Sequence, residues 1–183
     1  MASKLYVDEL EPADSSELTI TSLSKSSMPI GTVIKKTYYS IGRGTNTDVS
    51  FPNDDTIPQR SEGTEIFSQA YTPSISNCTI IITTYVRIGE TSNVNAGMQL
   101  GLFISDNDNA LIVGEVLTNV GTNPGGGNIT LMHSMSGWSG SKTLSLRSSG
   151  SNAYNYSTED ESYAAQKFGS AFTSAFIVEE IAG

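Results

Sequence analysis

The feature that most constrains the fold is a period-two alternation of apolar and polar residues in short segments. It is clearest in residues 79–88, and residues 98–104 repeat it. Successive side chains of a β-strand point to opposite faces, so this alternation is typical of a strand with one buried face. The apolar positions of both segments are therefore predicted core residues: Ile80, Ile82, Val86 and Ile88, then Met98, Leu100, Leu102 and Ile104.

Further strand candidates follow at the spacing expected of a β-sandwich or barrel. They cover residues 29–39, 64–71, 110–117, 128–136, 142–147 and 171–181. Segments rich in Gly, Asn and Pro separate them, and residues 159–168 alone have a helix-friendly composition, in a stretch too short to be convincing. We predict an all-β fold: an antiparallel, jelly-roll-like β-sandwich of about eight strands.

The chain divides into an N-terminal extension and a sandwich domain. Residues 1–60 hold two short alternating pieces, 4–7 and 18–23, and a long surface loop with few apolar anchors at 42–60. Residues 61–183 form the predicted sandwich, which the strand at 29–39 is expected to join. Because the two N-terminal pieces are too short to build a core, we expect the extension to serve attachment or packing between subunits.

The charge balance excludes several classes of partner. The chain has 10 Lys and Arg against 19 Asp and Glu, a formal net charge of −9. Nucleic-acid binding and adsorption to an anionic membrane both rely on clustered basic residues, so neither partner is expected. No stretch approaches the roughly 18 consecutive apolar residues that span a bilayer, and the N-terminus carries no apolar secretion signal. We therefore predict no membrane insertion and synthesis in the cytoplasm.

Catalytic, metal and cofactor sites are not predicted. The single histidine, His133, lies within an alternating strand, and the single cysteine, Cys78, opens an apolar one. A structural role is favoured for each, and together they provide neither a catalytic triad nor a metal-ligand set. Glu179 and Glu180 are neighbours in a strand and must face opposite sides, so they are not a catalytic carboxylate pair.

Two loop segments resemble ligand motifs only superficially. Residues 106–109, DNDN, alternate oxygen donors as a calcium loop does, but the sixth and twelfth positions hold Leu111 and Leu117 where Gly and Glu are needed. This segment is predicted to be a hairpin turn. Residues 125–127 are three glycines that no Lys follows, so a flexible loop is favoured over a phosphate-binding one.

The only tryptophan, Trp138, lies in a Gly- and Ser-rich turn and allows two interpretations. It could expose a stacking surface for a sugar or a partner protein, or it could fold back and cap the end of the sandwich. With Tyr154 and Tyr156 it is a candidate ligand or partner surface. A carbohydrate-binding module would be the corresponding function.

Two segments carry a resemblance to a known family: residues 71–82, YTPSISNCTIII, and residues 173–182, TSAFIVEEIA. The opening ASKLYVDEL at 2–10 and PIGTVIKK at 29–36 extend it. The chain resembles the C-terminal jelly-roll domain of tail-fibre-like and other virion structural proteins of tailed, notably marine, bacteriophages. No residue of that pattern is attached to an activity, so no functional residue is carried over.

The resemblance implies a non-enzymatic virion protein, made in the host cytoplasm, that assembles as a homotrimer. A short tail fibre or tail-associated appendage is expected first, with recognition of a host-surface receptor or glycan as a further role. The N-terminal extension would then dock on other virion proteins. A capsid decoration protein, such as a knob or head fibre, is the alternative.

A second apolar face in the predicted strands agrees with assembly. Ile81, Tyr85, Phe103 and Ile177 occupy the positions opposite to the predicted core set. A monomeric sandwich buries one face of each sheet, so a second apolar face predicts contact between subunits.

Overall fold

The structure is a computed structural model that describes residues 28–42, 51–52, 54–90, 96–118, 126–149, 152–154 and 173–183. Within these ranges the chain forms strands and turns and no helix, as predicted. The strands are β1 (Val33–Ile41), β2 (Thr64–Tyr71), β3 (Cys78–Glu90), β4 (Ala96–Ile104), β5 (Asn107–Thr118), β6 (Gly126–Trp138), β7 (Lys142–Ser149), β8 (Asn152–Tyr154) and β9 (Ser174–Ile181). The pieces predicted at 4–7, 18–23 and 159–168 lie outside the described residues.

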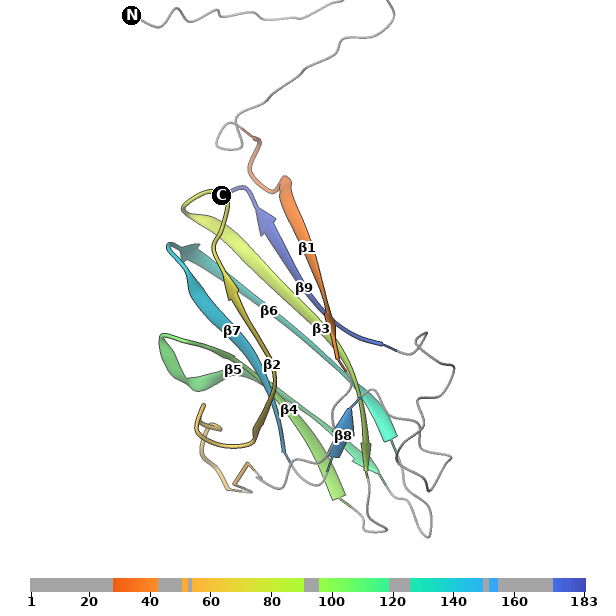
Figure 1. The fold of residues 1–183 in the computed structure, drawn as a ribbon. Helices are drawn as coiled ribbons and strands as arrows, with labels where there is room; N and C mark the ends of the chain where they lie inside the picture. The colour runs from red at the N-terminus through yellow and green to blue at the C-terminus, as the bar shows by residue number, and fades with distance from the viewer. Residues whose placement is uncertain are drawn as a thin grey trace, which may run out of the picture.

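The strands form two antiparallel sheets packed as a sandwich (Figure 1). A five-stranded sheet has the order β1-β9-β3-β6, with the short β8 also paired to β3, and a four-stranded sheet has the order β2-β7-β4-β5. This interleaved order, in which the chain crosses repeatedly between the sheets, is that of an eight-stranded jelly roll. The predicted fold class is therefore confirmed, with β8 as an addition.

The core lies between the sheets and contains the residues that the alternation predicted. Ile80, Ile82, Val86 and Ile88 of β3 have no exposed surface, and Met98, Leu100 and Leu102 of β4 are equally buried. Leu144 and Leu146 of β7 and Phe176 and Val178 of β9 complete the centre. Within each strand these core residues occupy every second position, so the residues between them point away from the core.

The predicted surface loop at 42–60 is wrong at Phe51. This side chain is 4% exposed, and its ring lies 6.3 Å from that of Phe103, on the outer face of the four-stranded sheet. The Phe51 amide donates to Ser149 Oγ at 2.7 Å. Phe103 is fully buried as a result. Its expected contact with another subunit is therefore wrong as well, because the same chain covers it.

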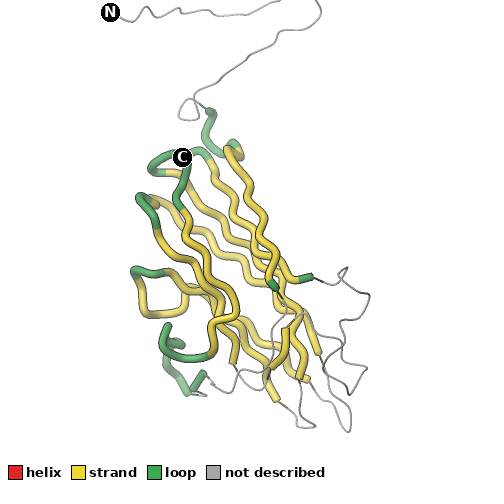
Figure 2. Tube along the Cα trace, viewed as in Figure 1, coloured by secondary structure: helices red, strands yellow, loops and turns green. Residues whose placement is uncertain are grey.

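The described chain begins and ends at one end of the sandwich (Figure 2). The Gly31 amide donates to the Ala182 carbonyl at 2.9 Å, and the Ala182 amide donates to the Thr32 carbonyl at 2.8 Å. Residues 1–27 are thus connected where β9 ends. None of the described segments is a helix long and apolar enough to cross a membrane.

Candidate functional site

Trp138 is a packing residue, so its candidacy as an exposed ligand surface is wrong. The side chain is 1% exposed, its indole N–H donates to the Gly140 carbonyl at 3.0 Å, and Tyr71 meets it edge-on at 6.1 Å. The Lys142 ammonium lies over the Trp138 ring, 5.5 Å from its centre, in a cation–π contact. The turn folds back and caps the sandwich, which was the second interpretation. The side chains of Tyr154 and Tyr156 lie outside what the structure describes.

A hollow of about 370 Å³ opens beside this cap. Its apolar lining comes from Ile104, Leu111 and Met135, and its polar lining includes Asp106, Asn107, His133 and Lys142. Lys142 Nζ lies 2.7 Å from Asp106 Oδ2, and this contact lowers the pKa of the Asp106 carboxyl. Its volume lies within the range of small-ligand sites, but its lining is more polar and more open than theirs. His133, which the sequence assigned to a structural role, thus lies at the wall of this hollow.

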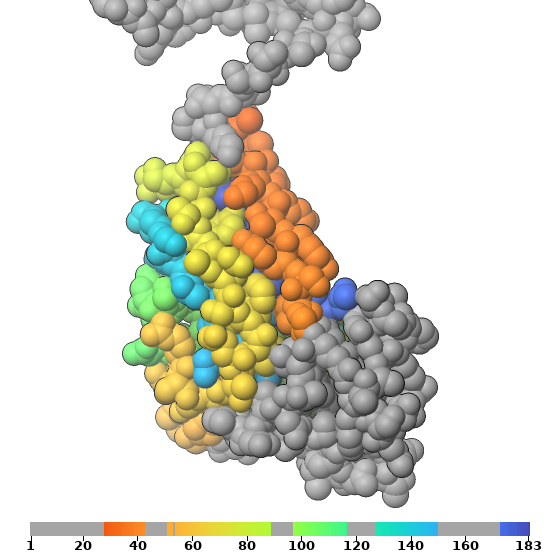
Figure 3. All heavy atoms as spheres, viewed as in Figure 1, coloured from red at the N-terminus to blue at the C-terminus, as the bar shows by residue number. Residues whose placement is uncertain are grey.

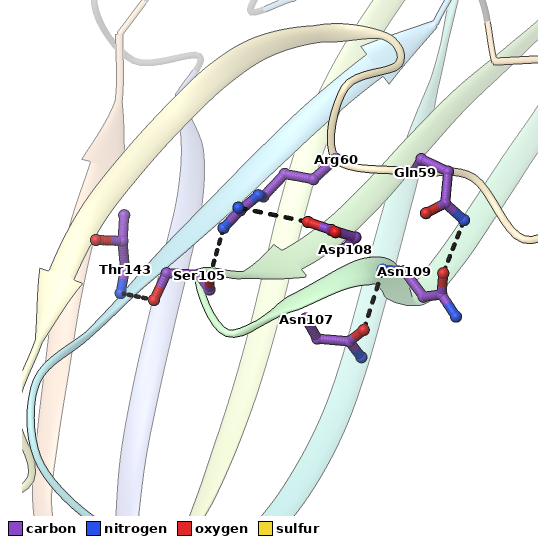
Figure 4. A network of polar contacts seen from close by, with 7 residues as sticks. All are labelled: Gln59, Arg60, Ser105, Asn107, Asp108, Asn109 and Thr143. Atoms are coloured by element: carbon purple, nitrogen blue, oxygen red, sulfur yellow. Dashed lines mark hydrogen bonds and ion pairs between the residues drawn. The ribbon is translucent and has the colours of Figure 1, made fainter.

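The predicted hairpin turn at 105–109 is confirmed, with Ser105 and Asp106 as the turn between β4 and β5. Figure 4 shows the polar contacts around it. Arg60 donates to the Ser105 carbonyl at 2.7 Å and lies 3.5 Å from Asp108, while Gln59 donates to Asn109 at 2.7 Å. Asp106 is paired with Lys142 and Asp108 with Arg60, and the contacts of Gln59 and Arg60 tie segment 58–62 to the hairpin.

A buried carboxylate joins the sheets near the end where β9 finishes. Glu180 has no exposed surface and accepts hydrogen bonds from the Tyr71 hydroxyl at 2.6 Å, the Ser74 amide at 2.9 Å and the Ser74 hydroxyl. Lys35 Nζ lies 3.8 Å away. Burial raises the pKa of Glu180, but the hydrogen bonds from Ser74 and Tyr71 and the charge of Lys35 outweigh it, so the net pKa lies below the ordinary value.

This cluster joins segments 71–82 and 173–182, which lie far apart in the chain. Tyr71 and Ser74 belong to the first segment and Glu180 to the second, and β3 and β9 of the same segments are paired strands. Glu179 points the opposite way, 3.1 Å from Lys36, as the strand geometry predicted.

The described residues contain no group of three or more His, Cys, Asp or Glu side chains that could hold a metal ion. Cys78 is fully buried, as predicted, and burial, with a further effect of Glu180, raises the pKa of its thiol. A thiol with a raised pKa is a poor nucleophile at neutral pH.

The largest candidate surface is the outer face of the five-stranded sheet. Strand register places one row of residues across it: Tyr38 on β1, Ile177 on β9, Thr83 on β3 and Met132 on β6. Tyr38 is 58% exposed and Met132 is 68% exposed. In the space-filling view, the residues of β1 form a continuous band along one side of the molecule (Figure 3).

We call this surface the outer sheet face and define it by the side chains that alternate away from the core. They are Lys36, Tyr38 and Ser40 from β1, Ala175, Ile177 and Glu179 from β9, Ile81, Thr83, Tyr85 and Arg87 from β3, and Asn128, Thr130, Met132 and Ser134 from β6. Ile81, Tyr85 and Ile177 were predicted to lie on such a face. Tyr38 and Met132 were not predicted to lie there. Each alternates with core-facing residues of its own strand, so the same period-two pattern would have placed them on this face.

The two outer faces of the sandwich differ in their cover. Phe51 lies over Phe103 on the four-stranded sheet, where Val113 remains exposed. The outer sheet face keeps Tyr38, Tyr85 and Met132 exposed. Its charged residues are Lys36, Arg87 and Glu179, with Lys36 and Glu179 paired to each other, so its formal charge is close to neutral on a chain of net charge −9.

Comparisons with known proteins leave the role of the chain open. No family model matches it, and no curated protein matches it. Among solved structures, the C-terminal domain of EclA, a sugar-binding protein, is similar with a TM-score of 0.33 and 10% identity, over 80% of this chain and 85% of that one. A likeness of this size supports no conclusion about ligand or role.

Proposed function

We propose that this chain is a non-enzymatic structural protein of a bacteriophage virion, a short tail fibre or tail-associated appendage that assembles as a homotrimer. The observation that carries the proposal is the difference between the two outer faces of the sandwich. On one face Phe51 covers Phe103 and Val113 stays exposed, while the other face presents exposed Tyr38, Tyr85 and Met132. Tyr and Met side chains are enriched at contacts between subunits, where charged residues are depleted.

The fold alone supports no role, since jelly rolls serve many functions. The family resemblance at residues 71–82 and 173–182 directs the proposal to virions. Residues 1–27 are connected at the end of the sandwich where β9 also ends, which suits an extension that attaches one end of the subunit to other virion proteins.

The test is to locate the chain in a purified particle, by a density map and by quantitative mass spectrometry. A tail fibre predicts a few trimers at the tail, in fixed ratio to a tail protein. A copy number that scales with the capsid lattice would replace the fibre by the alternative, a capsid decoration protein. Absence from purified particles would contradict both.

The hollow beside Trp138 favours a second candidate, binding of a host glycan. Asn107 and His133 offer donors and acceptors over an apolar floor that includes Leu111 and Met135. A glycan array tests it with Asn107→Ala, and Asn128→Ala on β6 is a control outside the hollow. Glycan binding that is lost in the first variant and kept in the second supports this candidate. Binding kept in both, or absent from the wild type, contradicts it.

A further inference from the structure

We propose that the outer sheet face is the surface through which three copies of this chain pack around a common axis. The number of subunits rests on the proposed function. The inference adds which face of each subunit is buried and which residues of neighbouring subunits meet. In this arrangement the outer sheet face is turned towards the axis, and one row of residues crosses it from edge to edge: Tyr38, Ile177, Thr83 and Met132.

The width of the sheet suits a threefold axis. Four strands at a spacing of about 4.8 Å make a face about 19 Å wide. Three such faces, set as the sides of an equilateral triangle, each lie about 5.5 Å from the axis. That distance is close to half of the roughly 10 Å that separates two packed sheets, so the side chains of the three faces meet at the axis without leaving a channel.

The area of the face sets the size of each contact between subunits. The strands β1, β9, β3 and β6 have 9, 8, 13 and 13 residues. At about 3.3 Å per residue and 4.8 Å per strand they cover about 680 Å². Because each face in a trimer is shared between two neighbours, about 340 Å² of this flat outline belongs to each contact, against about 800 Å² per partner in a standard interface. The stability of the trimer therefore depends on its three contacts together and on the relief of the side chains, which raises the accessible area above the flat outline.

The charge distribution permits copies of the same chain to approach through this face. The chain carries −9, so most pairs of its surfaces repel each other. On the outer sheet face Glu179 is the one acidic residue among the defining side chains, and Lys36 pairs with it at 3.1 Å. The acidic Asp106, Asp108 and Glu65 belong to the hairpin and the other sheet.

The edge of the sheet is a poor alternative for association. The open edge strand β1 carries Lys35 and Lys36, and its pairing with β9 shifts register between Val33 and Lys35. Lysines and bulges at an edge strand are the devices that oppose strand addition. Contact through side chains of the face is therefore favoured over continuation of the sheet into a neighbour.

Light scattering of the purified full chain provides the first test, with Met132→Lys and a matched control, Val113→Lys. Met132 and Val113 are both exposed apolar strand residues, but Val113 lies on β5 of the other sheet. We expect three times the mass of one 19.5 kDa chain for the wild type and for Val113→Lys. The mass of Met132→Lys is expected to fall threefold, with unchanged circular dichroism.

A cysteine pair tests the same interface without a destabilising charge. Tyr38 and Met132 lie on the two outermost strands of the row, so around a threefold axis Tyr38 of one subunit approaches Met132 of the next. The double variant Tyr38→Cys with Met132→Cys should be linked into a covalent trimer by a short bis-maleimide. Each single variant should stay unlinked, and buried Cys78 should not react.

The outcomes separate this inference from the proposed function. A trimeric wild type whose mass survives Met132→Lys, together with an unlinked double variant, overturns the outer sheet face as interface and leaves a trimeric virion protein in place. A monomeric or dimeric wild type overturns the packing inference and the homotrimer of the proposed function, whereas the role in the virion is judged by the particle map. If Met132→Lys unfolds, the cysteine pair decides.

Discussion

The Tyr71 hydroxyl donates to Glu180 at 2.6 Å and so joins the two sheets through a single buried contact. Tyr71 ends β2 in one sheet, and Glu180 lies in β9 of the other. Burial, together with the hydrogen bond to Glu180, raises the pKa of Tyr71, so this hydroxyl stays protonated and remains a donor. A buried carboxylate is stable only when its oxygens are satisfied, which makes this contact a sensitive point of the fold.

The first prediction concerns the hydroxyl alone. Tyr71→Phe leaves the ring against Trp138 and removes one donor from the buried Glu180 carboxylate. Hydrogen bonds to charged groups contribute about 1.5–3 kcal/mol, so the free energy of unfolding should fall by about that amount. Urea denaturation measures it. Tyr39→Phe removes the same atom from a ring that keeps its contacts with Phe67 and Phe176, and it should change stability by less than about 0.5 kcal/mol. Equal effects would contradict a special role of this contact.

The second prediction is a pH dependence that Glu180 controls. Its folded-state pKa lies below the ordinary value of 4.5 that it has in the unfolded chain. Between those two pKa values the unfolded state binds more protons, so the contribution of Glu180 is complete above about pH 5 and is lost as the pH falls through the folded-state pKa. Urea midpoints of the wild type should therefore decrease towards about pH 3.

Glu180→Gln isolates this effect from those of other carboxyls. The amide group faces the Ser74 amide donor without a charge, so the variant should be less stable at neutral pH by about 1–3 kcal/mol. Because it has no proton to bind, the difference between variant and wild type should shrink as the pH is lowered. A difference that stays constant with pH would show that Glu180 is not the titrating group.

The strands were predictable because burial of one face leaves a direct mark on the sequence. Ile80, Ile82, Met98 and Leu100 alternate with polar residues and lie in the core as expected. Phe51 and its partner Phe103 were mispredicted, since a single apolar residue in a Gly- and Asn-rich loop has no period, and its contact joins positions far apart in the chain.

The candidate site was less predictable than the fold. Whether Trp138 is exposed depends on which way its turn folds, and the Gly- and Ser-rich sequence permits both directions; in the structure nearby Gly140 and Lys142 hold the ring inward. The outer sheet face could be predicted in part, because Ile81 and Ile177 lie in the second phase of alternating strands. Its extent depends on strand order, which places β1 and β6 at the two edges of the pairing path.

The third prediction uses the fact that Trp138 is the only tryptophan. Because its indole is 1% exposed and has Lys142 over the ring, acrylamide should quench the native fluorescence weakly and the urea-unfolded fluorescence strongly. Free N-acetyltryptophanamide gives the fully exposed reference. Native quenching close to that reference would place the indole at the surface and restore Trp138 as a candidate ligand contact.

The fourth prediction tests the cover of the four-stranded sheet. Gly63 has φ +63°, and a Cβ there would lie 2.5 Å from Phe51 Cε1 and 2.8 Å from the Ser148 carbonyl oxygen. Gly140 has φ +73° with nothing within 4 Å of such a Cβ. Both alanine variants pay about 1–2 kcal/mol for the left-handed backbone, but Gly63→Ala must also move Phe51 or the paired strand β7, at about 1–3 kcal/mol more. Urea denaturation should therefore rank Gly63→Ala clearly below Gly140→Ala. Equal losses of stability in the two variants would mean that the Phe51 side chain can move away without cost and does not hold its segment against the sheet.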